Sequence, residues 1–217
     1  MKALPRSFFD VSAREAAHLL LGHWLVRETP EGQSGGPIVE TEAYLIGDPA
    51  CHAAPGLTKR NRVMFGPPGY AYVYLIYGYH YCVNAVCQPA GVAEAILIRA
   101  IEPCLGRSLM VGRRPVTNEP SLTNGPAKLC EALAIDRKLD GADLCDVTSP
   151  LFIAENPQYK TFREEHAPVV TTVRIGITQG ADLPLRFYLD GSKFVSHRGN
   201  RVARGRVVKS DLAAPRI

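Results

Sequence analysis

Apolar and polar positions follow two periods along this chain, one of about 3.6 residues and one of two. Helical spacing runs from Ser12 to Leu21, where Ser12 is the expected N-cap, Glu15 its capping-box partner and Gly22 the stop signal. A second helix is expected in NGPAKLCEALAI, residues 124–135, because Pro126 stands at a first helical position. The pattern thus predicts helices in both halves of the chain.

A period of two marks strands before and after these helices. The predicted strands are HWLVRET (23–29), PIVETEAYL (37–45), two runs about Tyr77-Gly78-Tyr79, GVAEAILIRAIEP (91–103), VVTTVRIGIT (169–178) and LPLRFYLDG (183–191). Residues 30–36 are predicted as a turn, and residues 106–123 and 149–168 as loops. Since strands cluster around one or two helices, we expect an α+β fold: a single mixed domain over residues 1–217 with a mainly antiparallel curved sheet and a few helices.

Composition narrows the class of protein. A chain of 217 residues with 46% hydrophobic content can bury a sizeable core in one domain. No apolar run reaches the roughly 18 residues that a membrane helix needs, and acidic residues interrupt the first segment. We therefore expect no membrane association and a cytoplasmic location, near the nucleoid in a bacterium, or the nucleus in a eukaryote.

The six cysteines are scattered, without a CxxC pair or a histidine at zinc-ligand spacing. We interpret them as reduced structural thiols and expect no bound metal.

Positive charge is concentrated in two places, although the net charge is only +4. Lys59, Arg60 and Arg62 lie in the short segment TKRNR. The segment from 193 to 209 contains no acidic residue, and its basic residues are Lys193, Arg198, Arg201, Arg204, Arg206 and Lys209. Solvated surface charge is the ordinary explanation, but two clusters near an aromatic-rich run favour phosphate contacts.

Two carboxylates fall on one side of the segment IVETEAYL. Alternation directs Glu40 and Glu42 one way, together with Ile38 and Tyr44. An outward-facing acidic strand would give the same pattern. The functional interpretation is that one carboxylate lies in a pocket as a general base and the other is structural.

The run GYAYVYLIYGYHYCVN places Tyr70, Tyr72 and Tyr74 on one face of a strand and Tyr77 at the tip of a protruding β-hairpin. A cross-strand tyrosine ladder would account for the first three. Packing accounts poorly for a ring at the tip. Such a ring could wedge between stacked bases, or serve a protein–protein interface.

Several motifs in this order resemble the alkyladenine (3-methyladenine) DNA glycosylase family over most of the chain. They are LLGHWLVR, IVETEAYL, the loop from CHAAPG to TKRNRVMFGPPG, YVYLIYGYHYCVN, ILIRAIEP, NGPAKLCEALAI and PLRFY. The resemblance implies a base-excision-repair enzyme that flips damaged purines out of double-stranded DNA. Purines of the 3-methyladenine, hypoxanthine and ethenoadenine type would then be cut at the N-glycosidic bond, leaving an abasic site.

The resemblance also implies roles for individual residues. Glu42 corresponds to the general base and Arg99 to the arginine that helps to hold the attacking water. The base pocket corresponds to Tyr44, His52, Tyr74 and Asn84, and the DNA-intercalating residue to Tyr77. No lysine matches a Schiff-base nucleophile, so a monofunctional hydrolase without a cofactor is expected.

Contacts with the DNA backbone are expected from basic residues near these motifs. They are Lys59, Arg60, Arg62, Lys128, Arg198 and Arg201. We expect the protein to act as a monomer. Two alternatives stay open from the residues alone: a catalytically silent nucleic-acid-binding protein on the same scaffold, and a carbohydrate hydrolase that uses Glu40 and Glu42 as an acid/base pair.

Overall fold

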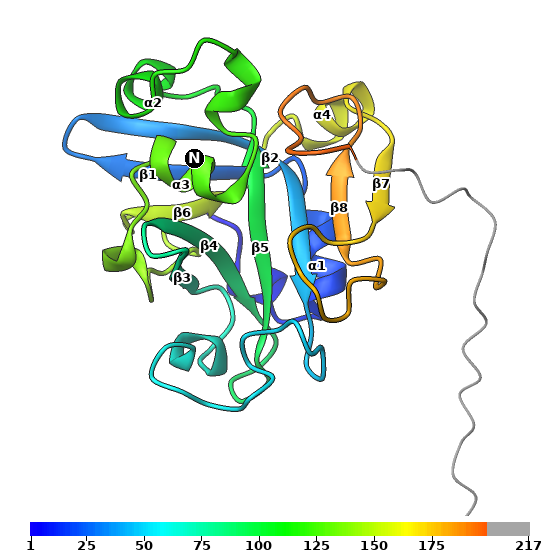
Figure 1. Ribbon diagram of the computed structural model, residues 1–217. Helices are drawn as coiled ribbons and strands as arrows, with labels where there is room; N and C mark the ends of the chain where they lie inside the picture. Colours follow the sequence, from blue (N-terminus) through cyan, green and yellow to red (C-terminus); the bar gives the residue numbers. More distant parts are fainter. Residues whose placement is uncertain (199–217) are drawn as a thin grey trace, which may run out of the picture.

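The longest strand, β2 (Gly32–Tyr44), organises the fold because it pairs with three other strands (Figure 1). In this computed structural model, which describes residues 1–198, β2 lies between β1 (Trp24–Thr29) and β5 (Glu94–Ile101) and also pairs with β8 (Arg186–Leu189). The remaining strands are β3 (Ala71–Ile76), β4 (His80–Cys87), β6 (Leu151–Ala154) and β7 (Val169–Thr172).

The strand order is β3-β4-β5-β2-β1-β6, with β8 on β2 and β7 on β8. All of these pairings are antiparallel. The sheet is curved (Figure 1). The predicted α+β class with a mainly antiparallel curved sheet is therefore confirmed.

Within residues 1–198, four α-helices accompany the sheet: α1 (Ala13–Leu20), α2 (Arg107–Arg113), α3 (Pro126–Ala132) and α4 (Tyr159–Glu165). The same part of the chain has four short 3-10 helices, at Arg6–Phe8, Arg62–Phe65, Glu119–Leu122 and Arg137–Leu139. The helices predicted at Ser12 and at Pro126 are confirmed. Ser12 accepts a hydrogen bond from the N–H of Arg14, whereas a capping box would use that of Glu15. Helix α1 packs on β2 and β5, and α3 on β4 and β5.

The turn predicted over residues 30–36 is wrong, because it is confined to Pro30 and Glu31 and β2 begins at Gly32. Two glycines inside the strand explain the error. A side chain at Gly35 would place its Cβ 2.2 Å from the carbonyl oxygen of Leu25, and one at Gly36 would place it 1.7 Å from that of Glu102. These glycines permit close approach of neighbouring backbone to a strand and do not mark a turn.

The two predicted loops also contain regular elements. Residues 106–123 include α2, and residues 149–168 include both β6 and α4. These elements have only four to seven residues each, too few to establish a period in the sequence. Tertiary packing determines them instead: all of β6 is buried beside β1.

His23 should make folding stability depend on pH. Burial is the main cause that lowers the pKa of His23 to about 4; Glu155 opposes this and Arg163 adds to it. The pKa of a histidine in the unfolded chain is near 6.5. Between that pH and about pH 4, His23 is therefore protonated in the unfolded chain but neutral in the folded chain. The free energy of unfolding should fall by about 3 kcal/mol from this group as pH drops from about 7 to about 4.

Denaturant titrations of wild type and His23→Gln across this range measure the effect. The variant should show a shallower loss of stability with acid than the wild type. Equal slopes for the two proteins would contradict the assignment, whatever their absolute stabilities.

Candidate active site

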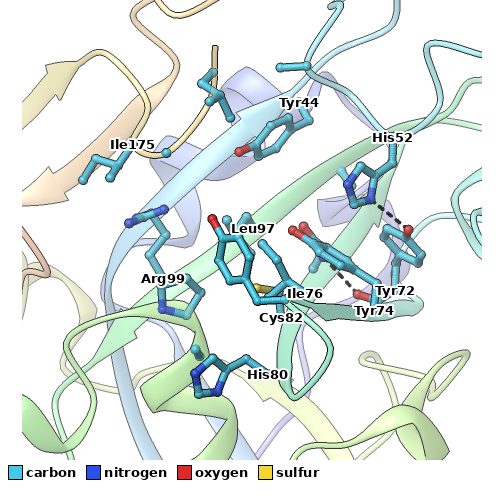
Figure 2. A pocket seen from close by; sticks show the side chains of 18 of the residues that line it. Tyr44, His52, Tyr72, Tyr74, Ile76, His80, Cys82, Leu97, Arg99 and Ile175 are labelled. Atoms are coloured by element: carbon cyan, nitrogen blue, oxygen red, sulfur yellow. Dashed lines mark hydrogen bonds between the residues drawn. The ribbon is translucent and has the colours of Figure 1, made fainter. Parts of the chain in front are cut away.

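A cavity of about 350 Å³ opens beside β3, β4 and β5 (Figure 2). The resemblance assigned seven residues to catalysis, to the base pocket or to DNA intercalation. Six of them line this cavity: Tyr44, His52, Tyr74, Tyr77, Asn84 and Arg99. The seventh, Glu42, lies directly behind the wall. Residues predicted from motifs spread over 58 positions of sequence, from 42 to 99, are thus brought together.

Glu42 is completely buried, and its carboxylate is held by three residues that line the cavity. Oε1 accepts a hydrogen bond from the backbone N–H of Ile175 at 2.8 Å and lies 3.1 Å from Nη1 of Arg99. Oε2 accepts a hydrogen bond from the hydroxyl of Tyr44 at 2.9 Å. The interpretation as an outward-facing acidic strand is therefore wrong.

Glu40 is equally buried but serves a different network. Its Oε1 lies 2.9 Å from Nε of Arg99 and 2.7 Å from Nε of Arg186, and it also accepts from the Ser196 hydroxyl at 2.8 Å. Burial alone would raise the pKa of Glu40, but Arg99, Arg186 and the N–H of Ser196 together hold it below the usual value. This carboxylate is an anionic anchor rather than a proton donor.

Arg99 joins the two carboxylates. Burial would lower its pKa, but Glu42 and Glu40 outweigh that effect and raise it. The side chain therefore stays cationic and occupies a fixed position between β5 and the cavity. Arg99 thus pairs with Glu40 and also lines the cavity, while its role in holding the attacking water stays a prediction.

Aromatic rings form one wall of the cavity. The rings of His52 and Tyr74 meet edge to face with centroids 4.4 Å apart, and Tyr72 lies 5.3 Å from Tyr74. Nδ1 of His52 is 2.9 Å from the hydroxyl of Tyr72, whose pKa burial raises to about 12. Burial, helped by Arg60, lowers the pKa of His52. An uncharged imidazole therefore faces the cavity at neutral pH.

Asn84 closes the same wall. Its side-chain amide donates to the carbonyl oxygen of Tyr72 at 3.0 Å and is buried. This bond fixes the orientation of the amide.

The turn between β3 and β4 consists of Tyr77, Gly78 and Tyr79. Tyr77 has a φ of 53° and is 75% exposed. A left-handed backbone conformation is uncommon for such a bulky residue, and an exposed ring gains little from packing. The turn thus presents a ring at the edge of the cavity; its insertion into DNA stays a prediction.

The predicted backbone contacts differ in their surroundings. Lys59, Arg60 and Arg62 are exposed, and the guanidinium of Arg60 lies 5.4 Å from the centroid of the Tyr74 ring. Lys128 donates to Oδ1 of Asn124 at 2.8 Å, and Arg198 donates to the carbonyl oxygen of Ser192 at 2.9 Å. Arg201 lies outside the described residues.

The strand predicted over residues 169–178 ends at Thr172, and the residues that follow it close the far side of the cavity instead. In this segment the backbone N–H of Ile175 donates a hydrogen bond to Glu42. Since every residue type except proline has a backbone N–H, no sequence motif marks such a contact. The preceding residue, Arg174, forms an ion pair with Asp48, and its guanidinium carbon lies 4.7 Å from the centroid of the Tyr44 ring. Arg186 and Ser196, the other partners of Glu40, are likewise remote in sequence from both carboxylates.

Residues 1–198 contain neither a metal-binding cluster nor a membrane-spanning helix. No group of three or more histidine, cysteine or acidic side chains there could hold a metal ion. None of the helices in that part is both long and apolar enough to cross a membrane.

Comparison with known proteins places the chain in a family. The model of the methylpurine-DNA glycosylase family matches residues 7–193. Proteins carrying the name "Putative 3-methyladenine DNA glycosylase" are 49% identical over 195 residues in Methanoculleus marisnigri and 50% identical over 195 residues in Carboxydothermus hydrogenoformans, covering 90% of this chain and 99% of each relative. One from Agrobacterium fabrum is 46% identical, covering 90% of this chain and 93% of the relative. The chain therefore belongs to the methylpurine-DNA glycosylase family and is a DNA glycosylase, a hydrolase of base excision repair.

Proposed function

We propose that this enzyme flips a damaged purine out of duplex DNA and hydrolyses its N-glycosidic bond with water activated by Glu42. The observation that carries the proposal is the carboxylate of Glu42, held behind an aromatic cavity by Arg99, Tyr44 and Ile175. The names of the relatives favour 3-methyladenine among the substrates.

Bond cleavage builds positive charge on the deoxyribose, and a buried carboxylate stabilises that charge while it takes a proton from water. Tyr44, Arg99 and Ile175 lie between Glu42 and the cavity, so the attacking water is expected to bind among these three residues. Arg99 stays cationic there and can orient the water without competing for its proton.

The cavity suits a planar base. Rings of Tyr44, Tyr74 and His52 line it, and stacking is worth about 1 to 3 kcal/mol per base. Two such contacts offset much of the few kcal/mol that flipping costs. A cationic alkylated purine gains further from the electron-rich faces of the tyrosines and is also a good leaving group.

The product should be an abasic site in an intact strand. No lysine is found among the cavity-lining residues in the described part of the chain. Without an amine nucleophile at the sugar, a Schiff base and the strand cleavage that follows it are not expected.

The alternatives fit less well. A carbohydrate hydrolase would need Glu40 as the acid, but Arg99 and Arg186 hold that residue ionised. A silent DNA-binding protein would not need the three contacts that hold Glu42.

A base-release panel tests the proposal. Duplexes that contain 3-methyladenine, hypoxanthine or ethenoadenine are incubated with the enzyme, and free base and strand breaks are measured separately. Free base without enzyme-dependent strand breaks is expected for at least one lesion, and an undamaged duplex is the control. Tight binding with no release from any lesion would support the silent binder instead.

Replacing Tyr77 with Ala should weaken binding to lesion DNA by about tenfold, because one stacking contact is lost. The free energy of unfolding should change by less than about 0.5 kcal/mol, since the ring is exposed. Fluorescence anisotropy and denaturant titration measure the two effects. The matched control is Tyr70→Ala: its half-buried ring lies under Arg6, so stability rather than binding should fall. The reverse pattern would contradict the wedge assignment.

A further inference from the structure

His80 lines the cavity but has no hydrogen-bond or ion-pair partner among residues 1–198. It is half-buried at the start of β4, and its ring contacts that of Tyr79 with centroids 4.2 Å apart. A half-buried imidazole with both nitrogens unused in the wall of a binding cavity is available to a ligand.

The neighbouring charged groups are already engaged. Arg99, on β5, pairs with Glu40 and Glu42. On α3, which packs against β4, Lys128 donates to Asn124, and Glu131 pairs with Arg114. The other titratable groups that face this region are Tyr74, Tyr77, Tyr79 and Cys82. None of these groups supplies His80 with a counter-ion.

Register places His80 at one end of the cavity. Alternate residues of β4, namely Asn84, Cys82 and His80, line it and pair with Tyr72, Tyr74 and Ile76 of β3. Each step of two residues covers about 6.5 to 7 Å, so His80 is about 13 Å along the strand from Asn84. Figure 2 shows His80 on the far side of Arg99 and Cys82 from Tyr44 and His52.

This order matches the order of groups in a nucleotide. With the base against His52 and Asn84 and the sugar near Arg99 and Glu42, the phosphodiester falls at the end where His80 lies. We propose that His80, in its protonated form, donates a hydrogen bond to a DNA phosphate that adjoins the flipped nucleotide. The inference rests on the proposed function and adds a phosphate contact from inside the cavity.

The contact makes DNA binding depend on pH. Histidine is the side chain that ordinarily changes charge between about pH 5 and 8, and a protonated imidazole gives a charge-assisted hydrogen bond to phosphate. The other histidine of the cavity, His52, has its pKa lowered by burial, so it takes up a proton at a lower pH than an ordinary histidine. Binding should tighten as pH falls.

The test measures binding of the full chain carrying Glu42→Gln to an ethenoadenine duplex by anisotropy. Between about pH 8 and about pH 5.5, affinity should rise about tenfold. The slope of log affinity against log salt should steepen by about 0.9 at the lower pH, as expected for one more phosphate contact. His80→Gln should remove both changes, and His80→Arg should bind at pH 8 as tightly as the parent does at low pH.

His18→Gln, on α1 and against Phe187, is the matched control and should keep the pH dependence of the parent. The inference is overturned if His80→Gln keeps that dependence, or if the Gln and Arg variants bind alike at pH 8. Base release by the wild type tests the proposed function independently. If the wild type releases base but His80→Gln binds DNA with the same pH dependence as its parent, only the phosphate contact is refuted.

Discussion

Replacing Glu42 with Gln is expected to lower the rate of base release by about a thousandfold or more, since the proposed general base is lost. Gln keeps the shape of the side chain: its carbonyl oxygen can still accept the hydrogen bond from the N–H of Ile175, while its amide NH2 can donate to the hydroxyl oxygen of Tyr44. Arg99 keeps its partner Glu40, so the fold should persist. Single-turnover release and anisotropy on the same duplex separate chemistry from binding, which should stay nearly unchanged.

Glu40→Gln is the matched control, because it removes the neighbouring carboxylate of the same strand. Two buried arginines then lose their shared anion, and the free energy of unfolding should fall by about 3 kcal/mol. Release per folded molecule should decline far less than in Glu42→Gln. Equal chemical losses in the two variants would remove the distinction between base and anchor, and full activity of Glu42→Gln would refute the base assignment.

Gly36→Ala should cost about 3 kcal/mol of stability or prevent folding altogether. The added Cβ would lie 1.7 Å from the carbonyl oxygen of Glu102 and 3.2 Å from the backbone nitrogen of Cys104. Both contacts are with backbone, so no side-chain rotation relieves them and the chain itself must shift. Chemical denaturation monitored by circular dichroism measures the loss.

Gly112→Ala provides the comparison. This glycine lies within α2, and its added Cβ would meet no atom within 4 Å. Alanine favours a helix over glycine, so stability should stay unchanged or rise by up to about 1 kcal/mol. Similar large losses in both variants would show that close backbone approach is not what requires Gly36.

The sequence was sufficient for elements with a clear period and for residues inside motifs. The helix after Ser12, the helix begun by Pro126 and the strands that carry Glu42 and Arg99 could all be predicted. Six of the seven residues in the predicted core of the site line one cavity. Each of them has a side chain whose chemistry can be interpreted without coordinates; their roles stay predictions.

What could not be predicted depends on tertiary contact. The glycines of β2 led to the prediction of a turn. They are required because a Cβ at either position would lie within 2.2 Å of a backbone carbonyl oxygen, and this contact exists only once the chain has folded. The N–H of Ile175 reaches Glu42 across 133 residues of sequence. The burial of both carboxylates likewise follows from Arg99, Arg186 and Ser196, which no local pattern connects to them.

The two halves of β2 pair with different strands. Strand β1 pairs with its first half, and β5 and β8 pair with its second half. Glu42 therefore lies on the same continuous strand as Gly35 and Gly36, where neighbouring backbone approaches most closely. Amide hydrogen exchange around Glu42 should then require opening of the whole domain rather than of a local lid. The position of the carboxylate is therefore as stable as the fold itself, whereas the exposed ring of Tyr77 lies in a three-residue turn outside the strands.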